Sequence, residues 1–127
     1  MPTSRRLAVT WLGLAAFLLS GSALAHPKLI SSTPADKAVG AAPRSIQLTF
    51  SEALMPQFSA ADVMITAMPG MAMAPAKVAT AVEMGTDGQT LVVTPTRPLT
   101  RGSYRVDWHV VSVDTHAVKG SFTFEVK

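Results

Sequence analysis

Short runs in which apolar and polar residues alternate cover most of the chain from Leu29 onward. In the clearest run, residues 103–111, every second residue from Tyr104 onward is apolar, and Trp108 is among them. Successive side chains of a strand point to opposite faces of a sheet, so this run predicts a strand with one face in the core and the other in solvent. Residues 121–126 repeat the pattern and predict a last strand of the same kind.

Further runs with the same pattern are separated by turn residues such as Asp87-Gly88 and Arg101-Gly102. They comprise residues 46–50, 63–67, 78–82 and 90–94, in addition to the run that begins at Leu29. About seven strands, with no helical periodicity and no internal repeat, predict an all-β sandwich or small barrel with Greek-key connections.

The segment 68–75 is rich in methionine, proline and glycine and is predicted to be a loop. Its methionines, Met68, Met71 and Met73, do not occupy periodic core positions, and Met64 lies just upstream. Clustered thioethers are soft ligands that favour Cu(I) and survive in an oxidising compartment. An adaptable apolar surface for a partner protein is the alternative interpretation.

Residues 1–25 have the features of a secretory signal peptide. Arg5 and Arg6 precede the apolar stretch 7–19, and Ala23-Leu24-Ala25 ends the segment. As a helix, the apolar stretch would span only about 20 Å, against roughly 30 Å for the hydrocarbon core of a membrane. We therefore expect cleavage after Ala25 and a periplasmic domain of residues 26–127 that is not embedded in a membrane.

Export would affect how the net charge and the lack of cysteine are interpreted. The net charge of +3 includes Arg5 and Arg6, and their removal leaves +1, which does not predict a nucleic-acid partner. With no cysteine, the domain has neither disulfides nor thiolate ligands. The chain also has no grouping of residues typical of a nucleophilic enzyme and no glycine-rich phosphate loop.

After cleavage, His26 would offer its α-amino group and its imidazole Nδ1 to a metal ion as a chelate. Pro27 has no backbone N–H, so the second backbone nitrogen cannot join the chelate and further ligands must come from elsewhere in the fold. The alternative is an accidental histidine at a mobile terminus.

Asp114-Thr115-His116 supplies the next candidate ligands. If the segment is extended, Asp114 and His116 project to the same side. Added to the His26 chelate, they complete a nitrogen and oxygen set that tetragonal Cu(II) prefers. The alternative is a turn capped by Asp114, with His116 merely exposed. Glu52 is an axial ligand, a group that orients a histidine, or a solvated charge at a strand edge.

These segments together resemble the CopC family of periplasmic copper-binding proteins. The resemblance covers essentially all of residues 26–127, and the matching segments are 26–29, 32–35, 48–52, 66–71, 98–100, 104–108 and 111–116. It implies an immunoglobulin-like β-barrel that binds Cu(II) at one end, through the amine and ring of His26 with Asp114 and His116, and with Glu52 nearby. It also implies a Cu(I) site in the methionine loop at the opposite end, in members that have one.

The chain departs from the family pattern in that loop. Family members that resemble a full Cu(I) site have a further methionine where this chain has Ile65. This chain also has Met73 in place of a histidine and Ala76 in place of the last methionine. Met68 and Met71 match the pattern. We therefore expect a weaker or rearranged Cu(I) site, with Met73 replacing the imidazole and Met64 assisting.

Three classes of function are compatible with these features. The resemblance favours a monomeric copper carrier or buffer in copper homeostasis and resistance, without catalysis, that exchanges copper with an inner-membrane transporter or another periplasmic copper protein. A copper-dependent polysaccharide monooxygenase also begins with a processed histidine, but it needs an open position for oxygen and a face of exposed aromatics. The alternation assigns the strand aromatics to the core. An adhesion or assembly module would bind no copper tightly.

Overall fold

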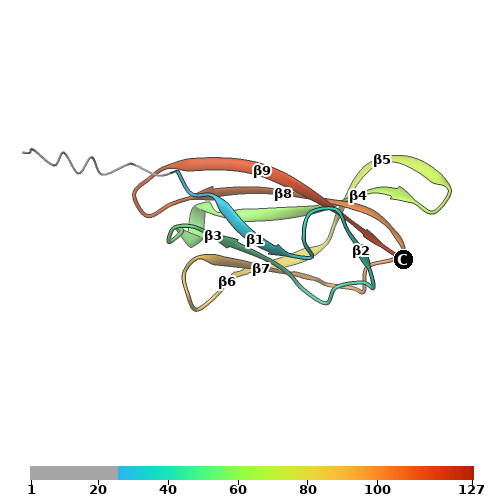
Figure 1. Cartoon of the computed structure of the whole chain (residues 1–127), viewed down its shortest axis with the longest axis horizontal. Coiled ribbons are helices and arrows are strands. Elements are labelled where there is room, and N and C mark those ends of the chain that lie inside the picture. The colour runs from blue at the N-terminus through green and yellow to red at the C-terminus, as the bar shows by residue number, and fades with distance from the viewer. Residues whose placement is uncertain (1–25) are drawn as a thin grey trace, which may run out of the picture.

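Residues 26–127, the part of the chain that the computed structural model describes, form two packed β-sheets (Figure 1). One sheet has the order β1-β3-β7-β6. Its strands are β1 (Leu29–Thr33), β3 (Ile46–Phe50), β7 (Thr90–Pro95) and β6 (Thr80–Met84). The other has the order β2-β9-β8-β4-β5. Its strands are β2 (Ala38–Gly40), β9 (Ala117–Val126), β8 (Gly102–Val111), β4 (Ala60–Met68) and β5 (Met71–Val78).

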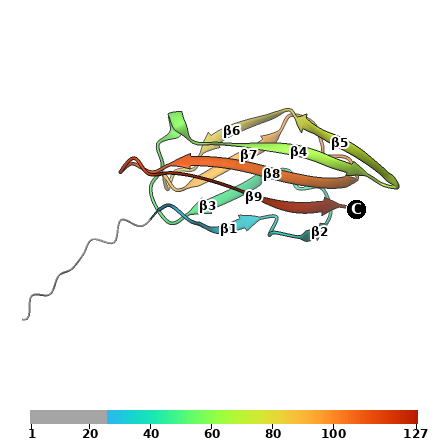
Figure 2. The same cartoon turned by 90° about the horizontal axis from the view of Figure 1, so that it is seen from above.

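The predicted all-β sandwich is confirmed. The chain passes from one sheet to the other several times, for example between β3 and β4 and between β7 and β8, and Figure 2 shows the two layers from above. A short 3-10 turn, Pro56–Phe58, lies between β3 and β4. Residues 26–127 contain no helix that is long and apolar enough to cross a membrane. The predicted signal peptide, residues 1–25, and its cleavage site lie outside the described residues.

Residues 26–127 contain nine strands, so the expected number of about seven was too low. The three-residue strand β2 was missed, and the run 78–82 proved to be the end of β5 followed by most of β6, which belong to different sheets. Alternation reveals that a segment is extended but not which sheet it joins.

The prediction of a loop over 68–75 was wrong, because β4 and β5 form a hairpin there. Pro69 and Gly70 make its two-residue turn, and Gly70 has the positive φ of 69° that glycine adopts without steric cost. Pro75 falls where the register with β4 shifts, on an edge strand. Proline, which has no backbone N–H to donate, is tolerated at such an edge position.

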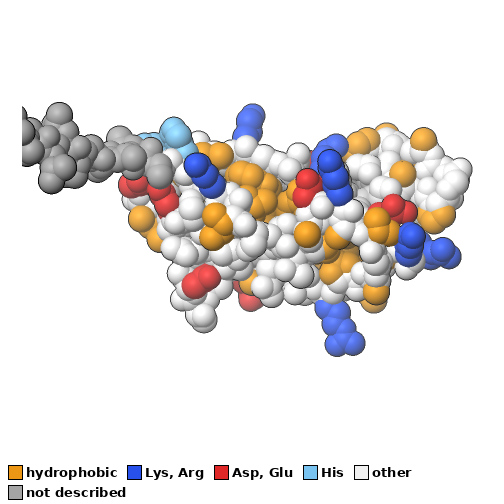
Figure 3. Space-filling model, viewed as in Figure 1, with side chains coloured by type: hydrophobic (Ala, Val, Ile, Leu, Met, Phe, Trp, Pro, Cys, Tyr) orange, Lys and Arg blue, Asp and Glu red, His pale blue; other side chains and the backbone are white. Residues whose placement is uncertain are grey.

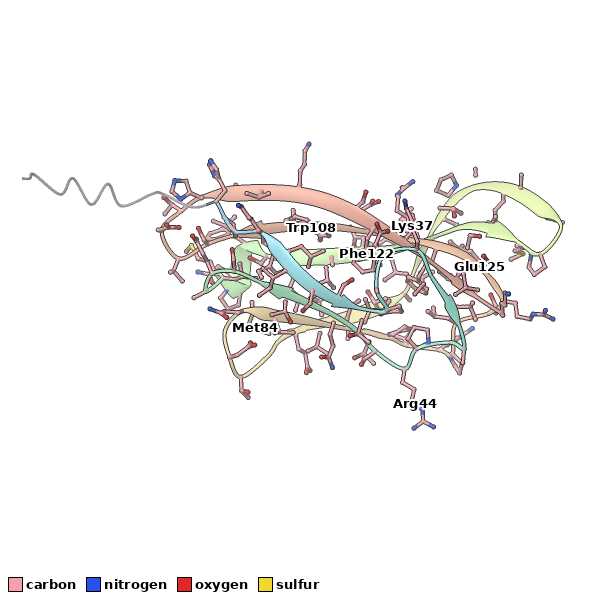
Figure 4. All side chains as sticks on the ribbon, in the orientation of Figure 1. Lys37, Arg44, Met84, Trp108, Phe122 and Glu125 are labelled. Carbon is pink, nitrogen blue, oxygen red and sulfur yellow. The ribbon has the colours of Figure 1, made fainter. Side chains whose placement is uncertain are left out.

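The core lies between the sheets and is aromatic at its centre. The predicted core face of β8, from Tyr104 to Val110, is buried throughout, whereas His109 is exposed as predicted. The Trp108 ring packs edge-on against Phe50 with ring centres 5.1 Å apart, and Trp108 lies inside the sandwich near Phe122 (Figure 4). Gly120 pairs with Trp108 across β8 and β9, and a Cβ there would lie 2.4 Å from the indole. Glycine at this position therefore makes room for the Trp108 ring.

The turn between β6 and β7 depends on the carboxylate of Asp87. Its oxygens accept hydrogen bonds from the backbone N–H groups of Gln89 and Thr90, both at 2.9 Å, and from the Thr90 hydroxyl at 2.7 Å. The Thr90 hydroxyl, followed by the Gln89 N–H, lowers the pKa of Asp87 below its ordinary value of 3.8.

This lowered pKa predicts a pH-dependent contribution to stability. A carboxylate with a lower pKa in the folded state stabilises that state above its unfolded-state pKa, and the contribution is lost as pH falls through the folded-state pKa. We expect Asp87→Ala to lower the thermal midpoint at pH 7, and the difference from the unsubstituted protein to shrink below about pH 3.8. Thermal unfolding followed by circular dichroism between pH 7 and pH 2 measures this. A difference that is constant over that range would contradict the prediction.

Candidate metal site

The residues that follow the predicted cleavage site are attached to the sandwich. Pro27 is fully buried. The backbone N–H of Lys28 donates to the Ser51 hydroxyl at 2.9 Å, and the N–H of Ser51 donates to the Lys28 carbonyl at 2.9 Å. His26 is therefore held at the end of β3, although its own side chain is exposed.

The segment after β8 is a tight turn rather than the extended segment considered from the sequence. The N–H of Ser112 donates to the His116 carbonyl at 3.0 Å, and the N–H of Thr115 donates to the Ser112 carbonyl at 2.8 Å. The N–H of Val113 donates to the carbonyl of Ala53 at 3.0 Å, just beyond β3. The segment that follows β3 is thus bonded both to the chain at Lys28 and to this turn.

This arrangement brings His26 against His116. Their ring centres are 5.1 Å apart and the rings are nearly perpendicular, at 78°. Two imidazoles that bind one metal ion at about 2.0–2.1 Å have ring centres roughly 4.5–6 Å apart. The observed separation is therefore compatible with a shared ion.

Asp114 also lies close to His116. Its Oδ1 is 3.3 Å from His116 Nδ1, and that nitrogen is inaccessible to solvent and has no hydrogen-bond partner among residues 26–127. Two donors that bind one ion at about 2.0–2.2 Å and at roughly right-angled to tetrahedral geometry lie about 2.8–3.6 Å apart. A buried nitrogen without a partner beside a carboxylate therefore fits a pair of metal ligands.

The electrostatics of this turn also suit a cation. The hydrogen bond from the Ser112 hydroxyl lowers the pKa of Asp114, and His116 lowers it further to a smaller extent. The Asp114 carboxylate is therefore ionised at neutral pH. Figure 3 shows acidic side chains beside the histidines at this end of the molecule.

Glu52 is near these residues through its chain neighbours. Ser51 is bonded to Lys28, Ala53 is bonded to Val113, and Glu52 is half-buried between them. Within the described range, no group of three or more His, Cys, Asp or Glu side chains is arranged to hold a metal ion. The structure thus brings His26 and Asp114 each to His116 but does not gather a complete set of side-chain ligands.

The candidate methionines lie at the opposite end of the sandwich, in the β4–β5 hairpin that extends past the other strands (Figure 1). Met68 and Met71 pair directly across the turn and are exposed at 44% and 60%. Met73 is half-buried where the register shifts, and Met64 lies further along β4, opposite Lys77. The hairpin therefore presents two adjacent thioethers to solvent.

Ser112 was not identified from the sequence. It is completely buried, and its hydroxyl donates to the Asp114 carboxylate. A hydroxyl two residues before an acid in a turn was the available indication, since such side chains bond to nearby groups in place of a regular ladder.

A two-sheet β-domain with two imidazoles and a carboxylate at one end, and paired thioethers at the other, has the donor types expected of a small protein that binds transition metals. The chain belongs to the CopC domain family, whose match covers residues 29–127.

Several relatives agree with this assignment. The chain is 51% identical to copper resistance protein C of Xanthomonas campestris pv. juglandis over 123 residues, which is 97% of each chain. It is 56% identical to copper resistance protein C of Pseudomonas syringae pv. tomato over 113 residues, 89% of this chain and 90% of that one. The crystal structure of PcoC, a methionine-rich copper resistance protein from Escherichia coli, superposes with a TM-score of 0.75 at 47% identity, covering 81% of this chain and all of PcoC.

Proposed function

We propose that this CopC-family protein is a periplasmic copper carrier that binds one Cu(II) ion at the His26 end. The ligands are the amine and ring of His26, His116 Nδ1 and the Asp114 carboxylate. The observation that supports the proposal most directly is the contact of His26 with His116, whose buried Nδ1 lies 3.3 Å from Asp114 Oδ1 and has no hydrogen-bond partner among residues 26–127. The copper-resistance names of the close relatives support the choice of metal.

Processing explains why the ligands are not already gathered. In the uncut chain, the nitrogen of His26 is an amide that binds metals poorly, and cleavage after Ala25 converts it to an amine. The buried Pro27, directly after His26, anchors the chain and so limits where that amine can lie. We propose that copper then draws the His26 ring and amine onto the Asp114 and His116 pair.

Glu52 is proposed as an outer group rather than a primary ligand. Its neighbours, Ser51 and Ala53, are fixed by backbone hydrogen bonds to the two segments that carry the ligands. A carboxylate held there adds negative potential for a cation and is in place to orient a bound histidine.

A second, weaker site for Cu(I) is proposed on the hairpin. Met68 and Met71, paired across the turn, supply two thioethers, and Met73 replaces the imidazole of the family pattern. Met64, farther along β4, joins only as an additional ligand.

A carrier fits this structure better than a polysaccharide monooxygenase. The aromatics of β8 and β9 are buried, so they form no flat face for a sugar polymer; these residues are Tyr104, Trp108, Phe122 and Phe124. We propose a monomer that passes its ion to an inner-membrane copper transporter or to another periplasmic copper protein.

Electron paramagnetic resonance of the Cu(II) form tests the ligand assignment. In the mature protein, His116→Ala should remove one nitrogen from the superhyperfine pattern and shift the copper parameters. Met71→Ala, at the opposite end, should leave the spectrum as it is. A spectrum that His116→Ala does not alter would exclude His116 as a ligand.

A further inference from the structure

The hydroxyl of Ser112 is the centre of the turn that carries Asp114 and His116. The residue is completely buried. Its Oγ donates to Asp114 Oδ1 and accepts from the backbone N–H of His116 at 3.2 Å. The side chain thus bonds to both residues proposed as copper ligands.

The same turn contains a strained residue. Thr115 has a φ of +73°, which is unfavourable for a β-branched side chain. Its hydroxyl donates to the Asp114 carbonyl at 2.6 Å, and its N–H donates to the Ser112 carbonyl. A left-handed residue between Asp114 and His116 reverses the chain, which allows both side chains to come to the same point.

The hydrogen bond from Ser112 selects one arrangement of the Asp114 carboxylate. The Asp114 side chain is 44% exposed, so without a partner it would sample several rotamers in solvent. The Oδ1 that accepts from Ser112 is also the oxygen 3.3 Å from His116 Nδ1. The bond therefore holds the carboxylate against the nitrogen that would share its metal ion.

We propose that Ser112 is a positioning residue for copper: its buried hydroxyl sets Asp114 and His116 in their binding orientation before the ion arrives. This inference rests on the proposed function and adds to it a residue that does not touch the metal. Groups that orient metal ligands typically account for 10–100-fold in affinity.

Ser112→Ala tests the proposal, with Ser59→Ala as its matched control. Ser59 is the other buried serine at this end, and its hydroxyl accepts from the backbone N–H of Val111 at 3.0 Å without contacting Asp114 or His116. In the mature protein, we expect Ser112→Ala to weaken Cu(II) binding 10–100-fold and to change the paramagnetic resonance spectrum. Ser59→Ala should leave both within twofold. Quenching of Trp108, the single tryptophan of residues 26–127, in competition with a chelator measures the affinity.

A double-mutant cycle separates positioning from general stability. In an Asp114→Ala background, Ser112→Ala should cost little further affinity, because the carboxylate that it orients is gone. An equal loss in both backgrounds, or unchanged affinity and spectrum in Ser112→Ala alone, would overturn the proposal. If Ser112→Ala folds poorly, Thr115→Gly relieves the positive φ. The double variant Ser112→Ala/Thr115→Gly should then fold and still bind more weakly than Thr115→Gly alone, and equal binding by the two would overturn the proposal.

Variants of the ligands themselves test the proposed Cu(II) site independently of Ser112. If Asp114→Ala and His116→Ala both bind Cu(II) as tightly as the unsubstituted protein, the proposed function is wrong. If they lose affinity and Ser112→Ala does not, only the positioning role fails.

Discussion

An alanine added ahead of His26 in the mature protein should lower its affinity for Cu(II) by about two orders of magnitude or more. The extra residue converts the His26 amine into an amide and moves the new amine away from the imidazole, so the six-membered chelate of amine and Nδ1 is lost. The ring of His26 stays beside His116, so the remaining binding comes from the imidazoles and Asp114. Titration against a chelator of known affinity measures the loss, with the terminus verified by mass spectrometry.

An alanine added after Lys127 is the matched control, because it lengthens the chain by the same residue at the other terminus. It should bind Cu(II) as tightly as the unextended protein. Equal affinity of the two extended proteins would mean that the processed amine is not a ligand, and the proposed copper site would have to be rebuilt without it.

Phe50→Ala should lower the free energy of unfolding by about 3–5 kcal/mol, the usual range for removing a buried phenylalanine side chain. Phe50 is 0% exposed and packs against Trp108 between the two sheets. It also pairs with Leu29 of β1, the strand that follows the His26 segment. Urea unfolding followed by Trp108 fluorescence measures the change.

Phe58→Ala is the comparison, since it makes the same truncation at a side chain that is 55% exposed. Surface substitutions of this kind usually change stability by less than about 0.5 kcal/mol. If the two variants lost similar stability, the Phe50 and Trp108 contact would not be the centre of the core.

Alternation predicted the strands that have one wet face and one buried face, because there the two-residue period is strict. β8 and β9 are the best examples, with every second residue buried along much of their length. β5 was missed because the rule against proline applies to central strands, whereas Pro75 lies on an edge at a register shift. β2 has three residues and pairs in parallel with β9, so it leaves no pattern to detect.

The candidate site was predictable in its residue types but not in its assembly. The short spacing of Asp114 and His116 indicated that they belong together, although it suggested an extended segment where the structure has a turn through Thr115. The contact of His26 with His116 joins segments that are far apart in the sequence, and it depends on the backbone pairing of Lys28 with Ser51. Ser112 was missed because its one indication, a hydroxyl two residues before an acid, applies to a turn, whereas an extended segment was considered there.

The burial of Pro27 has a consequence for the lifetime of the processed protein. Exopeptidases must draw the first residues of a chain, in extended form, into their own clefts, and most cleave poorly ahead of proline. If cleavage falls after Ala25 as proposed, the second residue of the mature chain is Pro27, which is packed inside the sandwich, and the third is Lys28, which is bonded to Ser51. Trimming would require β1 to peel away first, so the newly made terminus should persist in a protease-rich compartment for as long as the domain stays folded.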